Sequence, residues 1–192
     1  MRILAVMGSP RKNGITSTLA NEILEGAREN HHSPEVLYLS ELKLADCRGC
    51  MSCREESVCI FRGDDIGVLE EAVKRADLLI LASPVHWGNI SGLMLKAIER
   101  LFGFFIMEQP LGFPVKRNGK GKKAILVTSC STPFPFNWIF NQTRSVFSRF
   151  NEICKYSGIR IINKLALPGT LTRKEVPAAF IAKARKIGKN IK

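Results

Sequence analysis

Short apolar runs alternate with longer stretches that carry apolar residues at helical spacing, along nearly the whole chain. Apolar runs bounded by glycine, proline or polar residues predict strands. The predicted strands cover residues 3–7, 35–39, 78–82, 124–128 and 160–165. The stretches between and after them predict helices over about residues 16–28, 65–75, 92–105, 138–156 and 174–189.

The alternation of strands and helices predicts the α/β class. The runs LLILA at 78–82 and AILVT at 124–128 are apolar at nearly every position, which indicates strands buried on both faces of a parallel sheet. We expect a flavodoxin-like, doubly wound sheet of five strands in the order 2-1-3-4-5. The length of 192 residues favours a single domain over residues 1–192. Residues 45–62 break the alternation, and we interpret them as a cysteine-rich loop insertion.

The loop after the first predicted strand has the residue types of an anion site. It reads GSPRKNGITST over residues 8–18 and leads into a helix, whose first backbone N–H groups and dipole attract anions. Its spacing matches neither the dinucleotide fingerprint nor the Walker motif. The candidates to hold a monophosphate are Ser9, Arg11, Thr16, Ser17 and Thr18. The alternative is that the hydroxyl residues cap the helix and that glycine and proline form the turn.

The loop after the third predicted strand ends at the same edge of the sheet. Its aromatic, glycine and amide residues are suited to border a flat ring with polar edges, such as a flavin. They are Pro84, Val85, His86, Trp87, Gly88 and Asn89. The alternative is a tryptophan packed in the core beside a structural histidine. Because ligands of such sheets bind above strands one and three, the two loops together predict FMN.

Four cysteines with the spacing C-x2-C-x2-C-x5-C crowd the segment that breaks the alternation. They are Cys47, Cys50, Cys53 and Cys59. Such spacing lets one short loop wrap four thiolates around a small inorganic core, so we interpret them as ligands of an iron-sulfur cluster. Tetrahedral zinc, or thiols without a metal, are the alternatives. Cys154 lies in an apolar helical pattern and is expected in the core. Cys130 is expected to pack as a small residue, or else to approach the flavin.

Charge and hydropathy narrow the possible partners. The chain carries 29 Lys and Arg against 17 Asp and Glu, a net charge of +12. The basic clusters lack the interleaved aromatic residues of a nucleic-acid stacking surface, so we expect a solvated basic face or an acidic electron carrier, and no nucleic acid. No apolar stretch reaches the ~18 residues of a membrane span, and we expect a cytoplasmic protein without membrane contact.

The first loop with its helix, GSPRKNGITSTLA, the later stretch SPVHWGNISGLMLKAIER, and the intervening cysteines resemble the NADPH-dependent FMN reductase and multimeric flavodoxin superfamily. Within it, the chain is similar to the iron-sulfur flavoproteins. The resemblance implies that the first loop holds the FMN phosphate, that the second frames the isoalloxazine, and that the four cysteines bind a [4Fe-4S] cluster. His86 and Trp87 stand where relatives often have Tyr and Phe. Residues 129–132 are a further candidate for the ring edge.

The resemblance also implies a homodimer or homotetramer with FMN near a subunit interface, and a ferredoxin-like electron donor. We therefore expect an FMN-binding flavin-dependent oxidoreductase that passes electrons through cluster and flavin to an acceptor the sequence does not specify. The chain shows no Ser, His and Asp nucleophile set and no paired carboxylate site, so no catalytic residue is assigned. The alternatives are an NAD(P)H-dependent FMN or quinone reductase without a cluster, and a flavin-binding or zinc-stabilised interaction module.

Overall fold

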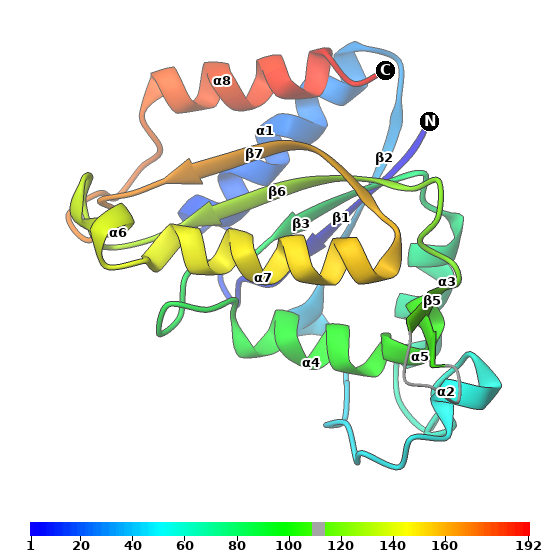
Figure 1. The fold of residues 1–192 in the computed structure, drawn as a ribbon. Helices are drawn as coiled ribbons and strands as arrows, with labels where there is room; N and C mark the ends of the chain where they lie inside the picture. Colours follow the sequence, from blue (N-terminus) through cyan, green and yellow to red (C-terminus); the bar gives the residue numbers. More distant parts are fainter. Residues whose placement is uncertain (109–113) are drawn as a thin grey trace.

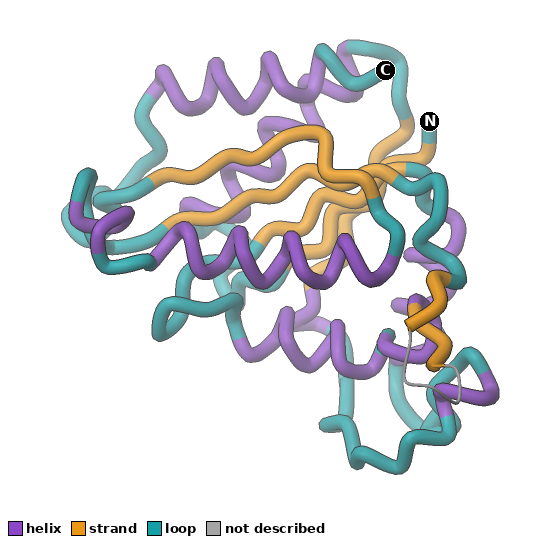
Figure 2. The backbone as a smooth tube through the Cα atoms, viewed as in Figure 1, coloured by secondary structure: helices purple, strands orange, loops and turns teal. Residues whose placement is uncertain are grey.

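A sheet of five parallel strands lies at the centre of the molecule, with helices packed on both faces (Figures 1 and 2). The computed structural model describes residues 1–108 and 114–192. The strands are β1 (Arg2–Met7), β2 (Ser33–Tyr38), β3 (Leu78–Ala82), β6 (Lys123–Ser129) and β7 (Arg160–Leu167). They lie in the order β2-β1-β3-β6-β7, and each neighbouring pair is parallel. The predicted doubly wound, flavodoxin-like class and its strand order are confirmed.

Side chains of the strands alternate between two apolar layers, because successive residues of a strand point to opposite faces. On β1, alternate residues such as Ile3 and Met7 pack with α1 (Ile15–Glu29) and α8 (Ala178–Lys189). The residues between them, such as Leu4, pack on the other face. That face is covered by the remaining long helices, which are α3 (Ile66–Arg75), α4 (Gly92–Arg100) and α7 (Gln142–Ser157). Burial of both faces explains the near-continuous apolar runs of the inner strands β1, β3 and β6.

Two glycines allow α1 and α8 to cross in direct backbone contact. A Cβ added at Gly26 would lie 2.1 Å from the carbonyl oxygen of Arg185, and one added at Gly188 would lie 2.0 Å from that of Ile23. Neither distance leaves room for a side chain. The C-terminal helix is therefore held closely against α1, whose N-terminus contributes to the site described below.

Three predicted helices differ from the structure at their boundaries. The helix predicted over 92–105 is divided into α4 and α5 (Phe102–Phe105) at Leu101, whose ψ of 4° departs from helical geometry. The start of the helix predicted over 138–156 falls in the short α6 (Phe136–Ile139), and the left-handed Asn141 (φ 56°) separates α6 from α7, which begins at Gln142. The last helix, predicted to start at residue 174, starts at Ala178 instead, because Pro177 has extended geometry (ψ 141°).

The structure also contains a short antiparallel hairpin that the sequence did not predict. It pairs β4 (Ile106–Glu108) with β5 (Pro114–Lys116). Three residues per strand are too few to show a period of two. Within the described ranges, no helix combines the length and apolarity that crossing a bilayer requires.

The cysteine-bearing segment lies between the short 3-10 helix η1 (Leu39–Glu41) and α3, and its one helical element is α2 (Cys53–Glu56). In Figure 1 it projects below α4 and α5, away from the carboxyl ends of the strands. That the segment is an insertion, and that residues 1–192 form one domain, stay predictions.

Candidate functional site

A cavity of about 580 Å³ lies where the loops after β1, β3, β6 and β7 meet. This is the edge of the sheet at which open α/β folds bind ligands, and the volume is in the range of small-molecule sites. Among the residues named as candidates from the sequence, the lining includes Ser9, Arg11, Thr16, Pro84 and Ser129. It also includes residues that were not singled out, which are Asn13, Gly14, Ile15, Thr170, Arg173 and Lys174. The last three come from the loop after β7. This loop carries two cations and lies far from the first loop in the sequence, and the fold brings the two loops together.

Hydrogen bonds fold the first loop around the carbonyl oxygen of Arg11. That oxygen accepts from Ser9 Oγ (3.1 Å), Ser17 Oγ (2.9 Å) and the Gly14 N–H (3.1 Å). Ser9 Oγ in turn accepts from the Arg11 N–H (3.2 Å). The loop hydroxyls thus shape the backbone, while the Arg11 side chain is exposed and lines the cavity.

The N-terminus of α1 faces this cavity without a side-chain cap. Gly14 is the N-cap residue, and no described side chain caps it. Thr18 Oγ1 donates to the Gly14 carbonyl (3.2 Å), and Thr16 Oγ1 lies 2.6 Å from Ser129 Oγ in a buried contact. The alternative that the Ser and Thr residues serve as helix caps is therefore wrong. The first amides of a helix have no intrahelical acceptor and carry the positive end of the dipole, so this terminus is suited to an anion.

The tip of the second loop is a tight turn that projects from the molecule. His86 and Asn89 exchange two backbone hydrogen bonds of 2.9 Å, and the residues between them, Trp87 (φ 51°) and Gly88 (φ 68°), are both left-handed. Positive φ at both central positions is typical of a type I′ turn. Trp87 is fully exposed, so the alternative of a tryptophan in the core is wrong.

Val85, His86, Trp87, Gly88 and Asn89 lie outside the lining of the cavity that Arg11 and Pro84 share. Asn89 lines a neighbouring groove of about 330 Å³ between α4, α5 and α7. Contact of this part of the loop with a flavin ring stays a prediction.

Ser91 joins the two loops. It caps the N-terminus of α4, where its Oγ accepts from the Met94 N–H (3.2 Å), and it donates through the same Oγ to the Gly8 carbonyl (2.6 Å). A Cβ at Gly8 would lie 2.9 Å from the Cβ of Met94, so glycine is required for this approach. The Ser91 N–H also donates to Ser83 Oγ (2.8 Å). The loops after β1 and β3 are thus held in fixed relation at the start of α4.

The four clustered cysteines line a second, much smaller cavity at the other end of α4. The cavity is shared by Cys47, Cys50, Cys53 and Cys59, with Phe61, Glu99 and Arg100 among the other lining residues. Cys47 and Cys50 are exposed, Cys53 is half-buried and Cys59 is buried. Over residues 1–108 and 114–192, no group of three or more His, Cys, Asp or Glu side chains is arranged to hold a metal ion. The donor set nevertheless fits an iron-sulfur cluster or zinc in kind, because four soft sulfur ligands lie around one cavity.

The pKa values of these thiols reflect their different surroundings. A hydrogen bond from the Ser52 backbone lowers the pKa of the Cys50 thiol. Burial raises the pKa of Cys53, and the charges of Cys59, Cys47 and Cys50 raise it further.

The two other cysteines are core residues. Burial raises the pKa of Cys154 to about 12, and the residue is 1% exposed, which confirms the predicted place in the core. Cys130 is 4% exposed and its Sγ donates to the Thr132 carbonyl (3.3 Å). The expectation that Cys130 packs as a small residue is confirmed.

Comparison with known proteins gives the family of the chain. The sequence profile described as NADPH-dependent FMN reductase matches residues 1–162. The chain belongs to this family. Proteins with similar sequences include iron-sulfur flavoproteins, which agrees with the resemblance found in the sequence. An iron-sulfur flavoprotein of Methanocaldococcus jannaschii is 34% identical over 100 residues, which are 52% of this chain and 51% of that protein.

A second relative, the iron-sulfur flavoprotein of Methanosarcina thermophila, is 33% identical over 100 residues, or 52% of each chain. The chain thus spans about half the length of these relatives. Among solved structures, the NAD(P)H:quinone oxidoreductase from Methanothermobacter marburgensis superimposes with a TM-score of 0.78 at 17% identity, covering 99% of this chain and 98% of the other. That likeness confirms the fold.

Proposed function

We propose that this chain is an FMN-binding, flavin-dependent oxidoreductase that carries electrons between a one-electron donor and an acceptor. The observation that carries the proposal is the cavity in which the uncapped N-terminus of α1 and the Arg11 side chain meet at the carboxyl edge of the sheet. Membership of the NADPH-dependent FMN reductase family supports FMN as the occupant.

The first loop is the proposed phosphate site. The amides at the start of α1 supply donors, and Arg11 supplies a charged fork for the phosphate oxygens. The loops that carry Pro84, Ser129 and Thr170 line the rest of the cavity and would border the remainder of the cofactor. When bound, FMN supplies redox chemistry that accepts one or two electrons.

We further propose a [4Fe-4S] cluster on Cys47, Cys50, Cys53 and Cys59. Their shared cavity and the names of the similar iron-sulfur flavoproteins support this assignment. Such a cluster transfers single electrons, so that together with FMN it would link a ferredoxin-like donor to a two-electron acceptor. We propose that the protein is cytoplasmic, because thiols stay reduced in that compartment.

The excess of basic residues is weaker support for an acidic electron donor than the net charge alone suggests, because some of these cations are bonded within the fold. In the loop around β5, Lys122 Nζ donates to the carbonyl oxygens of Lys74 (2.9 Å) and Ala76 (2.5 Å), which ties it to the end of α3. Arg117 donates to the Arg54 carbonyl (2.9 Å) in the cysteine segment. These cations stabilise the fold and are only partly available to a partner.

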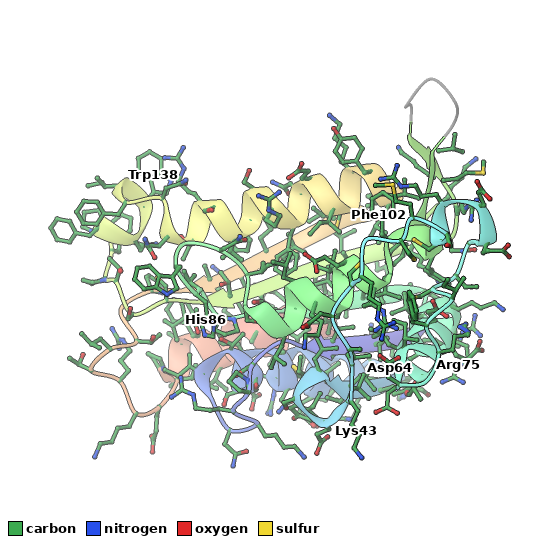
Figure 3. The ribbon with its side chains drawn as sticks, turned by 90° about the horizontal axis from the view of Figure 1, so that it is seen from below. Lys43, Asp64, Arg75, His86, Phe102 and Trp138 are labelled. Carbon is green, nitrogen blue, oxygen red and sulfur yellow. The ribbon has the colours of Figure 1, made fainter. Side chains whose placement is uncertain are left out.

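A second copy of the chain is the partner we propose for an exposed aromatic surface near α6. This surface consists of Trp87, Phe134, Phe136, Trp138 and Phe140, each at least 50% exposed. At 150–250 Å² for a whole aromatic side chain, their exposed parts amount to roughly 700 Å². A standard stable interface buries about 800 Å² on each partner. Figure 3 shows His86, the neighbour of Trp87 in the chain, and Trp138 at the same end of the molecule.

Anaerobic purification tests the proposal. We expect yellow-brown protein with about four irons per chain and one FMN, whose broad absorbance near 400 nm bleaches on reduction. Yellow protein without iron that oxidises NADPH rapidly would instead identify a plain FMN or quinone reductase. Colourless protein that leaves FMN fluorescence unquenched would refute flavin binding. Light scattering of the intact protein tests the dimer, and Trp138→Lys is expected to yield monomers.

A further inference from the structure

Arg100 places a buried guanidinium against the cysteine segment. It is the last residue of α4, and its side chain is 1% exposed. A buried cation is costly unless it is paired and fully hydrogen-bonded, so its partners indicate what it stabilises.

The guanidinium bonds both ends of the cysteine segment. Nη1 donates to the Ala45 carbonyl (2.8 Å), just before the first cysteine, and to Asp64 Oδ2 (2.7 Å). Nη2 donates to the Phe61 carbonyl (2.6 Å), just after the last cysteine, and to Asp64 Oδ1 (3.1 Å). One side chain from α4 thus closes the segment into a loop.

The remaining guanidinium donor contacts a cysteine directly. Arg100 Nε donates to Cys59 Sγ (3.3 Å), a charge-assisted bond to sulfur. The Cys59 N–H donates to Oε1 of the buried Glu70 (3.3 Å), so both the backbone and the sulfur of Cys59 are fixed. Cys47 and Cys50, by contrast, are exposed.

We propose that Arg100 is the positioning residue of the cysteine site, which holds Cys59 Sγ ready as a ligand and raises the reduction potential of the cluster bound there. This inference rests on the proposed cluster. A hydrogen bond and a positive charge beside a ligand sulfur stabilise the more negative, reduced state of a cluster.

The test compares Arg100→Gln and Arg100→Lys with the wild type, each as full-length protein reconstituted anaerobically with iron and sulfide. Iron per chain and the cluster potential are measured, the latter by a redox titration followed by electron paramagnetic resonance. We expect Arg100→Gln to shift the cluster equilibrium at least tenfold towards the oxidised form, about 59 mV for one electron. Arg100→Lys is expected to shift the cluster potential less than Arg100→Gln does, because lysine keeps the positive charge. The FMN potential and FMN content serve as internal references and stay unchanged.

Arg117→Gln is the matched control. Arg117 also holds the segment, through Ser57 Oγ and the Arg54 carbonyl, but makes no described contact with sulfur. An unchanged cluster potential in Arg100→Gln, or an equal shift in Arg117→Gln, would overturn the role of Arg100. If both Arg100 variants fail to fold and bind no FMN, Asp64→Glu replaces them in the experiment, because it keeps both charges and displaces the guanidinium. An unchanged cluster potential in Asp64→Glu would also overturn the proposal. A wild-type chain that binds no iron would overturn the cluster itself.

Discussion

Asp64→Asn is expected to destabilise the protein by about 3 kcal/mol at pH 7, because it leaves the buried Arg100 without its counter-charge. Asp64 accepts two hydrogen bonds from Arg100, one from the Ala45 N–H (2.8 Å) and one from the Ile66 N–H (3.1 Å). The hydrogen bond from Arg100 is the largest cause that lowers the pKa of Asp64 from 3.8 to about 2. That difference of about 1.8 pH units corresponds to about 2 kcal/mol in favour of the ionised form. Asp64 is 13% exposed, so solvent screens the pair little.

The pH dependence follows from the direction of this shift. Because the pKa of Asp64 is lower in the folded state, its carboxylate stabilises the fold fully above pH 3.8 and loses this effect as the pH falls towards 2. Urea unfolding of wild type and Asp64→Asn, followed by circular dichroism, is the assay. The stability gap between them is expected to narrow by about 1 kcal/mol from pH 7 to pH 3.

Asp65→Asn is the control for this experiment. Asp65 Oδ2 accepts from the Lys43 N–H (2.7 Å), and no described contact joins it to Arg100. Its loss is expected to cost about 1 kcal/mol, the ordinary contribution of one hydrogen bond. Two results would refute the reasoning: an Asp64→Asn protein within 1 kcal/mol of wild type at pH 7, or a gap that does not change with pH.

Three further predictions concern the cavity, the helix crossing and the exposed turn. Arg11→Gln is expected to weaken FMN binding about 10- to 100-fold, as measured by quenching of FMN fluorescence, whereas Lys12→Gln stays within threefold of wild type; equal affinities would argue against the phosphate site. Gly188→Ala is expected to lower the free energy of unfolding in urea by about 1–3 kcal/mol, because its Cβ would collide with the α1 backbone. Gly67→Ala is the control: the space around Gly67 is open, so the better helix propensity of alanine is expected to raise stability by up to about 1 kcal/mol. In the monomeric Trp138→Lys background, Trp87→Asn is expected to raise stability by about 1 kcal/mol, because asparagine tolerates positive φ better, and a fall in the melting temperature of that monomer would contradict this.

The inner strands β1, β3 and β6 could be predicted from the sequence because burial on both faces leaves continuous apolar runs such as 78–82, and the strand order followed from the doubly wound class. Most boundary errors arose where a single residue leaves helical geometry. Leu101 and Asn141 interrupt otherwise helical patterns, and neither residue type by itself marks a break. Such breaks depend on tertiary packing, which overrides local propensity.

The part of the cavity formed by the first loop could also be predicted, because its signal lies in neighbouring residues of the sequence. Glycine, hydroxyl and arginine residues before a helix indicate an anion site locally, and Arg11 and Thr16 do line the cavity. Arg173 and Lys174 could not be found this way, because only the parallel order of β1 and β7 in the sheet brings their loop to the same edge. The exposure of Trp87 was also beyond local pattern, since an aromatic residue after a buried strand equally fits a core position.

Helix α4 follows its N-cap Ser91, which is bonded to Gly8 beside the proposed flavin cavity, and ends at Arg100 in the cysteine site. In Figure 3 His86 and Asp64 mark these two ends. At about 1.5 Å per residue, this rod sets the spacing of the two sites at roughly 13 Å along its axis. An added residue within α4 would therefore do more than lengthen it. It would turn Arg100 by about 100° away from the cysteine segment, whereas changes in loop length would leave the spacing intact.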